Sequence, residues 1–223
     1  IIMKTQEKNF DGIKLSGFTA ILIMLALTGT AIYLLSLPQT PSIIAGVICG
    51  ICVVVMLPGF MIIQPNNSRV LTFFGRYAGT VISNGFYWVN PLFLKSTVTL
   101  RILNLNIDPI KVNDKVGNPI MIGAVVVWRI KDTYKASFDI SGNIREFVQI
   151  QSDAALRQVA GMYAYDTNET IDKVTLRSDE SGEITQRLED ELNSRLAIAG
   201  IEIVEARINY LAYASEIASV MLR

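Results

Sequence analysis

The sequence predicts an α+β protein that begins with a transmembrane hairpin of two helices, continues into a soluble domain of strands followed by helices, and ends at the start of another helix. Three observations lead to this prediction. No charged side chain occurs from Leu15 to Ile63. Strand-like alternation prevails from 70 to 130, and helical periodicity follows Asp132. The chain is 51% hydrophobic and 18% charged, against about 25% charged for an average soluble domain, so part of it is suited to a non-aqueous environment.

The composition excludes several classes of function. Twenty Lys and Arg balance twenty Asp and Glu without a basic stretch, so nucleic acid is not an expected partner. Histidine is absent, which removes the commonest metal ligand and general base along with the zinc proteases and triads that need it. Cys49 and Cys52, the two cysteines of the chain, form neither a disulfide framework nor a four-ligand zinc site. We therefore expect no metal, no cofactor and no catalytic residue.

Two apolar helices are predicted in the uncharged segment, over 15–37 and 42–63. They are separated by a turn at 38–41, where two prolines end the first helix. The first helix is long enough to cross a hydrocarbon core of about 30 Å. Pro58-Gly59 ends or kinks the second near Leu57, so a re-entrant second segment is the alternative to a full span.

Basic residues flank the hairpin, and its turn carries none. Lys4, Lys8 and Lys14 precede the first helix, and Arg69 and Arg76 follow the second. Because basic flanks stay in the cytoplasm, both ends of the hairpin are expected there. The expected regions are a cytoplasmic flank (1–14), the hairpin (15–63), a soluble domain (64–211) and the start of a C-terminal helical, coiled-coil-like region (212–223).

Small residues in the second helix indicate close helix packing. Gly46 and Gly50 form a G-x-x-x-G pattern with Cys49 beside them. Packing against the first helix, near Ala26 and Gly29, is the preferred interpretation. A contact between subunits is the alternative.

Strands are predicted to open the soluble domain. Residues 70–74 form a short apolar strand, and turn residues over 79–85 indicate a hairpin-like start. Alternation over 98–107 changes phase once, which predicts a single bulged strand, and Pro109 marks its end or an edge position. Residues 120–130 are apolar on both faces and are expected to form the central strand.

Two helices are predicted to follow. The first covers 144–162 and is capped by Asn143 or Ser141. The second begins at Asp179 or Ser181 and ends at Ala199, with leucines spaced four apart and Gly200 as its stop.

A last strand is predicted over 201–208, with a phase change at 204–206. A new helix starts at Ser215 and is unfinished at Arg223. Strands followed by helices indicate an antiparallel or mixed sheet with helices packed on it.

The order of several motifs resembles the SPFH or Band 7 family, which includes stomatins, prohibitins, flotillins and bacterial Hfl proteins. The resemblance covers 62–223 and fits the bacterial stomatin-like branch best. The matching stretches are 62–66, 70–80, 85–91, 109–114, 125–130, 146–160 and 206–208.

The resemblance implies an SPFH-type fold over the soluble domain and a non-enzymatic scaffold. Such proteins assemble side by side into large rings or cages, organise lipid microdomains and regulate membrane proteases or channels. The expected partners are membrane lipids, further copies of the chain and client membrane proteins. The expected location is a bacterial inner membrane, with the domain on the cytoplasmic side because two apolar runs return the chain there.

Two groups of residues are candidate contact sites. Phe86, Tyr87 and Trp88 suit the headgroup region of a membrane, or else pack within a strand. Charged residues on the two helices suit contacts between subunits in a ring, although a solvated helix face is the simpler interpretation for each one. The charged candidates are Arg145, Glu146, Glu189, Asp190, Glu191 and Arg195.

Two other classes of function remain as alternatives. A membrane hydrolase with a Ser/Lys site has no fixed sequence spacing that a search could exclude, although no G-x-S-x-G or phosphate-loop motif is present. A channel or transporter subunit is disfavoured, because the predicted spans carry no ionisable residue.

Overall fold

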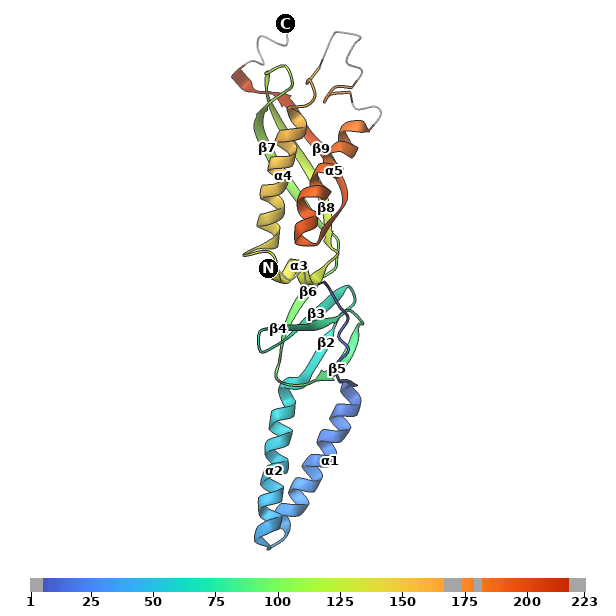
Figure 1. The fold of residues 1–223 in the computed structure, drawn as a ribbon, viewed down its shortest axis with the longest axis vertical. Helices are drawn as coiled ribbons and strands as arrows, with labels where there is room; N and C mark the ends of the chain where they lie inside the picture. Colours follow the sequence, from blue (N-terminus) through green and yellow to red (C-terminus); the bar gives the residue numbers. More distant parts are fainter. Residues whose placement is uncertain (1–5, 167–173, 179–181, 217–223) are drawn as a thin grey trace. The chain divides into compact units, whose positions relative to one another are not determined.

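A computed structural model describes residues 6–166, 174–178 and 182–216 and divides the chain into two compact units, residues 1–100 and 101–223 (Figure 1). The fold is α+β, as the sequence predicts, with two apolar helices followed by a sheet-rich domain. The predicted single domain over 64–211 is divided, because its first part packs with the hairpin in unit 1.

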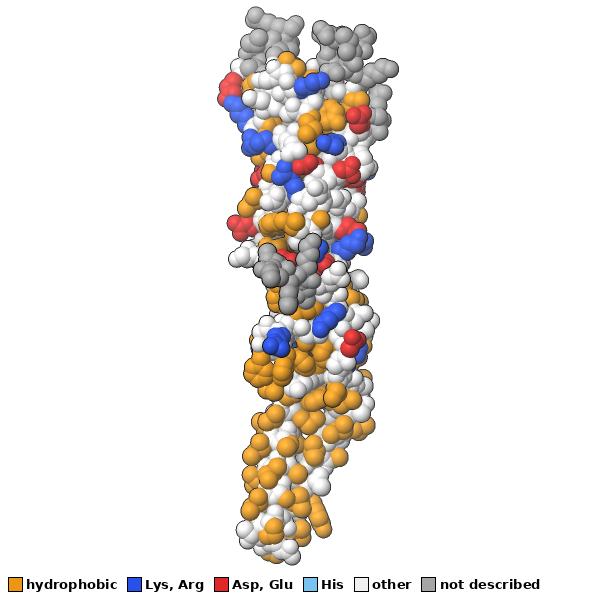
Figure 2. Space-filling view, in the orientation of Figure 1, with side chains coloured by type: hydrophobic (Ala, Val, Ile, Leu, Met, Phe, Trp, Pro, Cys, Tyr) orange, Lys and Arg blue, Asp and Glu red, His pale blue; other side chains and the backbone are white. Residues whose placement is uncertain are grey.

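The hairpin of unit 1 consists of α1 (Gly17–Ser36) and α2 (Thr40–Met56), followed by the 3₁₀ turn η1 (Leu57–Gly59). Both helical segments are long and apolar enough to cross a membrane, with mean hydropathies of 2.2 and 2.4. Only 11% of each apolar window is buried within the protein, so most of these side chains face outward. Figure 2 shows this hydrophobic surface along both helices.

The second helix is shorter than the predicted 42–63. After η1, strand β2 (Phe60–Ile63) begins. Pro58 cannot donate a helical hydrogen bond, which ends the helix, and Met61 and Ile63 are then buried in the core of unit 1. The last apolar residues of the run therefore belong to a sheet.

Two three-stranded antiparallel sheets complete unit 1. In the first, β5 (Gly85–Val89) lies between β1 (Lys14–Ser16) and β2. In the second, β3 (Asn67–Phe73) lies between β4 (Arg76–Val81) and β6 (Phe93–Thr99). The domain does start with a hairpin, but its turn is at Phe74 and Gly75, and the first of the predicted turn residues over 79–85 lie inside β4. The two sheets share one buried apolar cluster, formed by Met61, Ile63, Leu71, Val81 and Val89.

The prediction of one bulged strand over 98–107 is wrong. Strand β6 ends at Thr99 and β7 (Leu103–Asn113) begins a different sheet, with the boundary between the units at Leu100. The change of phase thus marks the passage from one core to another. A bulge within one strand and a short connection between two strands produce the same shift in the alternation of apolar residues.

Unit 2 is built on an antiparallel sheet in the order β7, β8 (Pro119–Ile130), β9 (Ile201–Tyr213). Strand β8 is central, as its two apolar faces predict. The register slips at Val204 in β9, within the predicted phase change, and β9 continues to Tyr213, beyond the predicted end. Pro109 lies at a register shift in the edge strand β7.

Helices α4 (Ile144–Ala160) and α5 (Glu183–Leu196) lie side by side on one face of this sheet (Figure 1). Asn143 caps α4 by accepting a hydrogen bond from the Arg145 backbone N–H at 2.9 Å. Gly182 precedes α5 in a left-handed conformation, whereas the predicted caps Asp179 and Ser181 lie outside the described residues.

Two further helical segments flank these elements. The short helix α3 (Thr133–Phe138), capped by Asp132, was not predicted. The 3₁₀ turn η2 (Ala197–Ala199) extends α5 to the predicted end. Ser215 and Glu216 are helical, which fits the start of the expected C-terminal helix, and the rest of that segment lies outside the described residues.

Candidate membrane-attachment site

Both ends of the apolar hairpin are built into one sheet. Strand β1 leads directly into α1, and β2 follows α2 and η1. Both strands pair with β5, so that Ser16 lies opposite Tyr87 and Phe60 lies opposite Trp88. The start of α1 and the end of α2 therefore meet at the same edge of unit 1, which we call the helix base.

Aromatic side chains fill the helix base. The Phe86 ring packs edge-on against Phe18 of α1 and stacks on Phe60 of β2, with both centroid distances 5.5 Å. Trp88 Nε1 donates a hydrogen bond of 2.9 Å to the Met56 carbonyl at the end of α2. Apolar rings that also supply a polar group are suited to the boundary between hydrocarbon and water.

Two glycines allow this close packing. A Cβ atom on Gly17 would lie 2.2 Å from the Phe86 ring, and one on Gly59 would lie 2.2 Å from Trp88 Nε1. Non-bonded heavy atoms do not approach that closely, so any larger residue requires the ring or the helix end to move. The helix base thus depends on glycine at the first residue of α1 and the last residue of η1.

A second apolar surface lies at the same edge of unit 1. Chain direction places it there, because Val89 ends β5 beside the helix ends and β6 starts soon after at Phe93, opposite Phe73 of β3. Phe74 is 77% exposed and Leu94 is 68% exposed, and Phe73 and Leu92 are also exposed. Figure 2 shows hydrophobic side chains gathered next to the helices. This apolar edge is suited to contact the surface of a membrane.

A lysine also contacts the segment that follows α2. Lys95 Nζ donates hydrogen bonds to the carbonyls of Pro58 and Phe60, the latter at 3.5 Å. Burial and the charge of Arg69 lower the pKa of Lys95 from its ordinary value. A cation is favourable beside the Pro58 carbonyl, because this carbonyl lies in the last helical turn, η1, where carbonyls lack partners within the helix.

Comparison with known families assigns the part of the chain that follows the hairpin. A family model described as "SPFH domain / Band 7 family" matches residues 61–223. The chain belongs to the SPFH domain / Band 7 family. A search of curated proteins finds no match. SPFH proteins are typically membrane-associated scaffolds and generally not enzymes.

The match begins inside β2, so the hairpin of this SPFH protein precedes the family domain. Two apolar helices together with an SPFH domain indicate association with a membrane. Among the described residues of the SPFH protein, no group of three or more Cys, Asp or Glu side chains is arranged to hold a metal ion.

The two glycines of the G-x-x-x-G pattern differ in their packing in this SPFH protein. Gly46 is buried against α1, where an added Cβ would lie 2.8 Å from the Leu35 side chain and 3.1 Å from the Ala31 carbonyl. Gly50 has no atom within 4 Å of such a Cβ, and Cys49 is half-buried. The contact with α1 therefore lies at Ala31 and Leu35, rather than near Ala26 and Gly29 as expected from the sequence.

The aromatic candidates Phe86, Tyr87 and Trp88 lie together at the helix base. All three are half-buried. Tyr87 packs under Lys14, with the ammonium 4.8 Å from the ring centroid, and its hydroxyl donates to the Asn84 carbonyl at 3.1 Å. The three aromatic residues connect the sheet to the helices. The apolar side chains that are more exposed belong to the apolar edge.

The charged candidates of the SPFH domain separate into two groups. Glu189 Oε1 accepts a hydrogen bond from the Ala206 N–H at 3.1 Å, and Glu191 forms an ion pair of 2.6 Å with Arg195. These three side chains stabilise unit 2 internally. Arg145 and Glu146 in the first turn of α4 are exposed, and Asp190 on α5 is exposed with a contact to Gln186.

Sequence reasoning missed Gly17, Gly59, Phe73, Phe74 and Lys95. The two glycines stand at the ends of the apolar helices, a position that signals close packing only once its partner is known. The Phe73-Phe74 pair is a visible signal, but the sequence predicts it only as the end of the apolar strand over 70–74. Lys95 lies between apolar and polar residues with no pattern around it.

Proposed function

We propose that this protein is a membrane-anchored scaffold whose subunits assemble side by side into a large ring or cage. In this role it organises membrane microdomains and regulates membrane proteins or proteases. The observation that carries the proposal is the pairing of β1 and β2 with β5, which joins both ends of the apolar hairpin to the sheet of unit 1. An anchor connected in this way holds the first SPFH unit at a defined orientation to the bilayer.

A fixed orientation favours assembly. Anchored copies diffuse in two dimensions with the same side facing the bilayer, so their effective concentration is high and weak lateral contacts add up. The apolar edge supports the same geometry by giving unit 1 a second point of contact with lipid. The stomatin-like branch and a bacterial inner membrane are the proposed family position and location.

We propose that the hairpin crosses the membrane twice and that both SPFH units lie in the cytoplasm. The support is that β1 and β2 pair with the same strand, so α1 and α2 begin and end at one side. The flank before α1 contains lysines, and basic flanks favour the cytoplasmic side.

Cysteine labelling tests this topology in cells. In a background without Cys49 and Cys52, a Thr40→Cys variant should react with an impermeant reagent added from outside, because Thr40 is the first residue of α2, next to the turn of the hairpin. An Asn67→Cys variant should react only after the cells are opened. Reaction of position 67 alone in intact cells would contradict the topology, and reaction of neither position would favour a re-entrant hairpin.

The mass of the detergent-extracted particle tests assembly. The full chain should give a particle of many subunits, and Arg145→Glu with Asp190→Lys should reduce its mass, because complementary faces in a ring lose their match when charge is reversed. These positions are exposed, whereas reversing Glu189 and Glu191 would also break contacts inside unit 2.

A matched control exchanges the same charges elsewhere. Lys8→Glu with Asp11→Lys alters two exposed residues of unit 1 and should leave the particle mass unchanged. Monomers or dimers of the unaltered chain in several mild detergents would contradict the scaffold proposal.

A further inference from the structure

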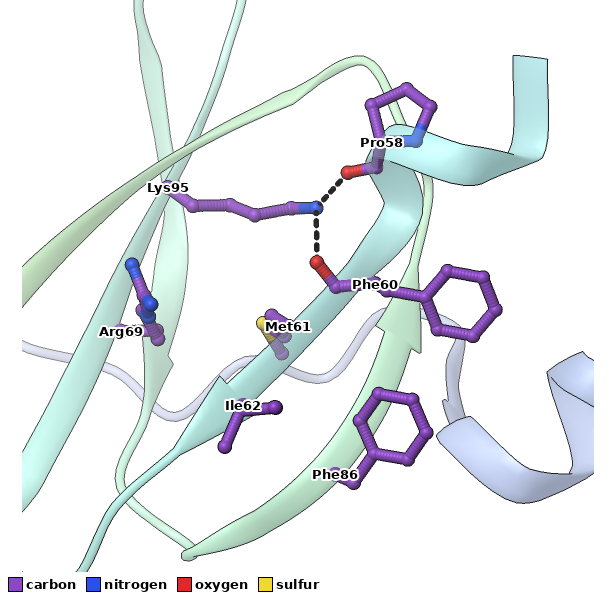
Figure 3. Close-up of a pocket in the computed structure, with 7 residues that line it drawn as sticks. All are labelled: Pro58, Phe60, Met61, Ile62, Arg69, Phe86 and Lys95. Carbon is purple, nitrogen blue, oxygen red and sulfur yellow. Dashed lines mark hydrogen bonds between the residues drawn. The ribbon is translucent and has the colours of Figure 1, made fainter. Parts of the chain in front are cut away.

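A pocket of about 400 Å³ opens beside the end of α2 in unit 1. Its lining includes Pro58 and Phe60 from the end of the hairpin, Arg69 from β3, Phe86 from β5 and Lys95 from β6 (Figure 3). It combines two cationic side chains with two aromatic rings. Its aromatic side is continuous with the helix base through the contact between Phe86 and Phe18.

The sheet register places the two cations on one face. Leu71 lies opposite Lys95, and Arg69 precedes Leu71 by two residues, so all three side chains point to the same side of the β3–β6 pair. Figure 3 shows Lys95 extending to the carbonyls of Pro58 and Phe60, with Arg69 on the adjacent strand.

The positive charge of this pocket is not balanced. Arg69 is half-buried and its backbone pairs with β4 and β6, but its guanidinium forms no hydrogen bond or ion pair within 6–166, 174–178 and 182–216. The charge of Arg69 also contributes to lowering the pKa of Lys95, as expected for two nearby cations without an anion between them. An anion bound between them would relieve this repulsion.

Capping of the helix explains Lys95 but not Arg69. Two carbonyls accept from Lys95, and an ammonium has three donors, so one remains for a ligand. The guanidinium of Arg69 has five donors in a planar fork that matches the oxygens of a phosphate. The two side chains together thus offer donors that the protein itself does not use.

We propose that Arg69 and Lys95 bind a phosphate group in this pocket, with the guanidinium contacting two of its oxygens and the ammonium a third. A membrane lipid is one source of that phosphate, since the pocket lies at the end of an apolar helix, where headgroups of a bilayer would be. A soluble phosphate compound is the other source. The lipid assignment rests on the proposed membrane anchor.

Binding of phosphatidylglycerol to the full chain tests the proposal. The chain is extracted in an uncharged detergent, and bound lipid is counted by native mass spectrometry as phosphatidylglycerol or the phosphate-free lipid dioleoylglycerol is added. Arg69→Gln should weaken phosphatidylglycerol binding by about tenfold or more, as expected for loss of charge-assisted hydrogen bonds. Binding of dioleoylglycerol should be weaker and unchanged by the substitution.

Arg76→Gln is the matched control. Arg76 is exposed, carries the same charge and is the first residue of β4, just after the turn at Phe74, at the same edge of unit 1. General attraction between a basic surface and an anionic lipid would be reduced equally in both variants. An equal loss in the two variants, or no loss in Arg69→Gln, would overturn the proposal.

Competition identifies the source of the phosphate. If a lipid is the ligand, millimolar glycerol phosphate should leave phosphatidylglycerol in place. Displacement by glycerol phosphate that requires Arg69 would assign the pocket to a soluble phosphate. Absence of binding of either compound would overturn the proposal.

Membrane insertion and particle mass are measured on the same preparations. Both should be the same for Arg69→Gln as for the unaltered chain. Loss of lipid binding with intact assembly would support phosphate binding in the pocket. Small particles that still bind lipid through Arg69 would contradict the scaffold proposal and leave the phosphate-binding proposal standing.

Discussion

A Leu192→Asp substitution should unfold unit 2. Leu192 is fully buried on α5, in a row with Ile184, Leu188 and Leu196 that packs on the sheet. A carboxylate placed there loses its water and finds no partner, at a cost of several kcal/mol. Typical domains are stable by only about 5–15 kcal/mol, so most or all of the free energy of unfolding is lost.

Hydrogen exchange of the full chain in detergent measures this effect for each unit separately. Peptides from β8 and β9 should lose protection in the variant, while peptides from β3 and β6 keep it. Ser194→Asp introduces the same carboxylate at an exposed position of α5 and should leave protection unchanged. Protection of β8 equal to that of the unaltered chain would show that the apolar row is not the core of unit 2.

The sequence predicts unit 2 well because its elements carry strong local patterns. Strand β8 carries apolar residues on both faces, of which one is buried and the other is mostly half-buried, and such a run favours a central position in the sheet. The leucines of α5 recur every four residues, which defines one buried face. The short helix α3 escapes prediction, since six residues are too few for a periodic pattern to appear.

Unit 1 is less predictable because its contacts join distant parts of the chain. Lys14 in β1 pairs with Val89 of β5, far along the sequence, and no local pattern indicates this pairing. Residues 60–63 and 15–16, which form strands in the structure, are therefore predicted from the sequence as ends of apolar helices. A truncated protein that begins at residue 64 would lack β1 and β2, both partners of β5.

In the candidate site, too, residues with a local sequence pattern are predictable, and residues brought together by distant contacts are not. Phe86, Tyr87 and Trp88 stand out as three consecutive aromatics, and the structure places them at the helix base. Arg69 and Lys95 meet only through the register of β3 with β6. Charged residues on helix faces are visible in the sequence, but their internal partners are not. Glu189, for example, accepts from the backbone of β9.

A Gly59→Val substitution should separate the hairpin from the sheet of unit 1. The new Cβ would lie 2.2 Å from Trp88 Nε1 and 2.6 Å from the Val89 carbonyl, and one of these contacts is backbone. Either the end of α2 shifts or the indole turns away, which breaks its hydrogen bond to Met56. Overpacking of this kind costs about 1–3 kcal/mol, and the broken hydrogen bond adds about 1 kcal/mol.

Gly50→Val is the control, because that residue is also glycine in the apolar hairpin but has open space around its Cβ position. Urea unfolding of the full chain in detergent, followed through Trp88 fluorescence in a Trp128→Phe background, should show a lower midpoint for Gly59→Val and little change for Gly50→Val. Because a displaced anchor no longer sets the orientation of unit 1, Gly59→Val should also reduce particle mass while membrane insertion persists. Equal midpoints and particle masses for both variants would mean that the helix base does not hold the anchor to the sheet.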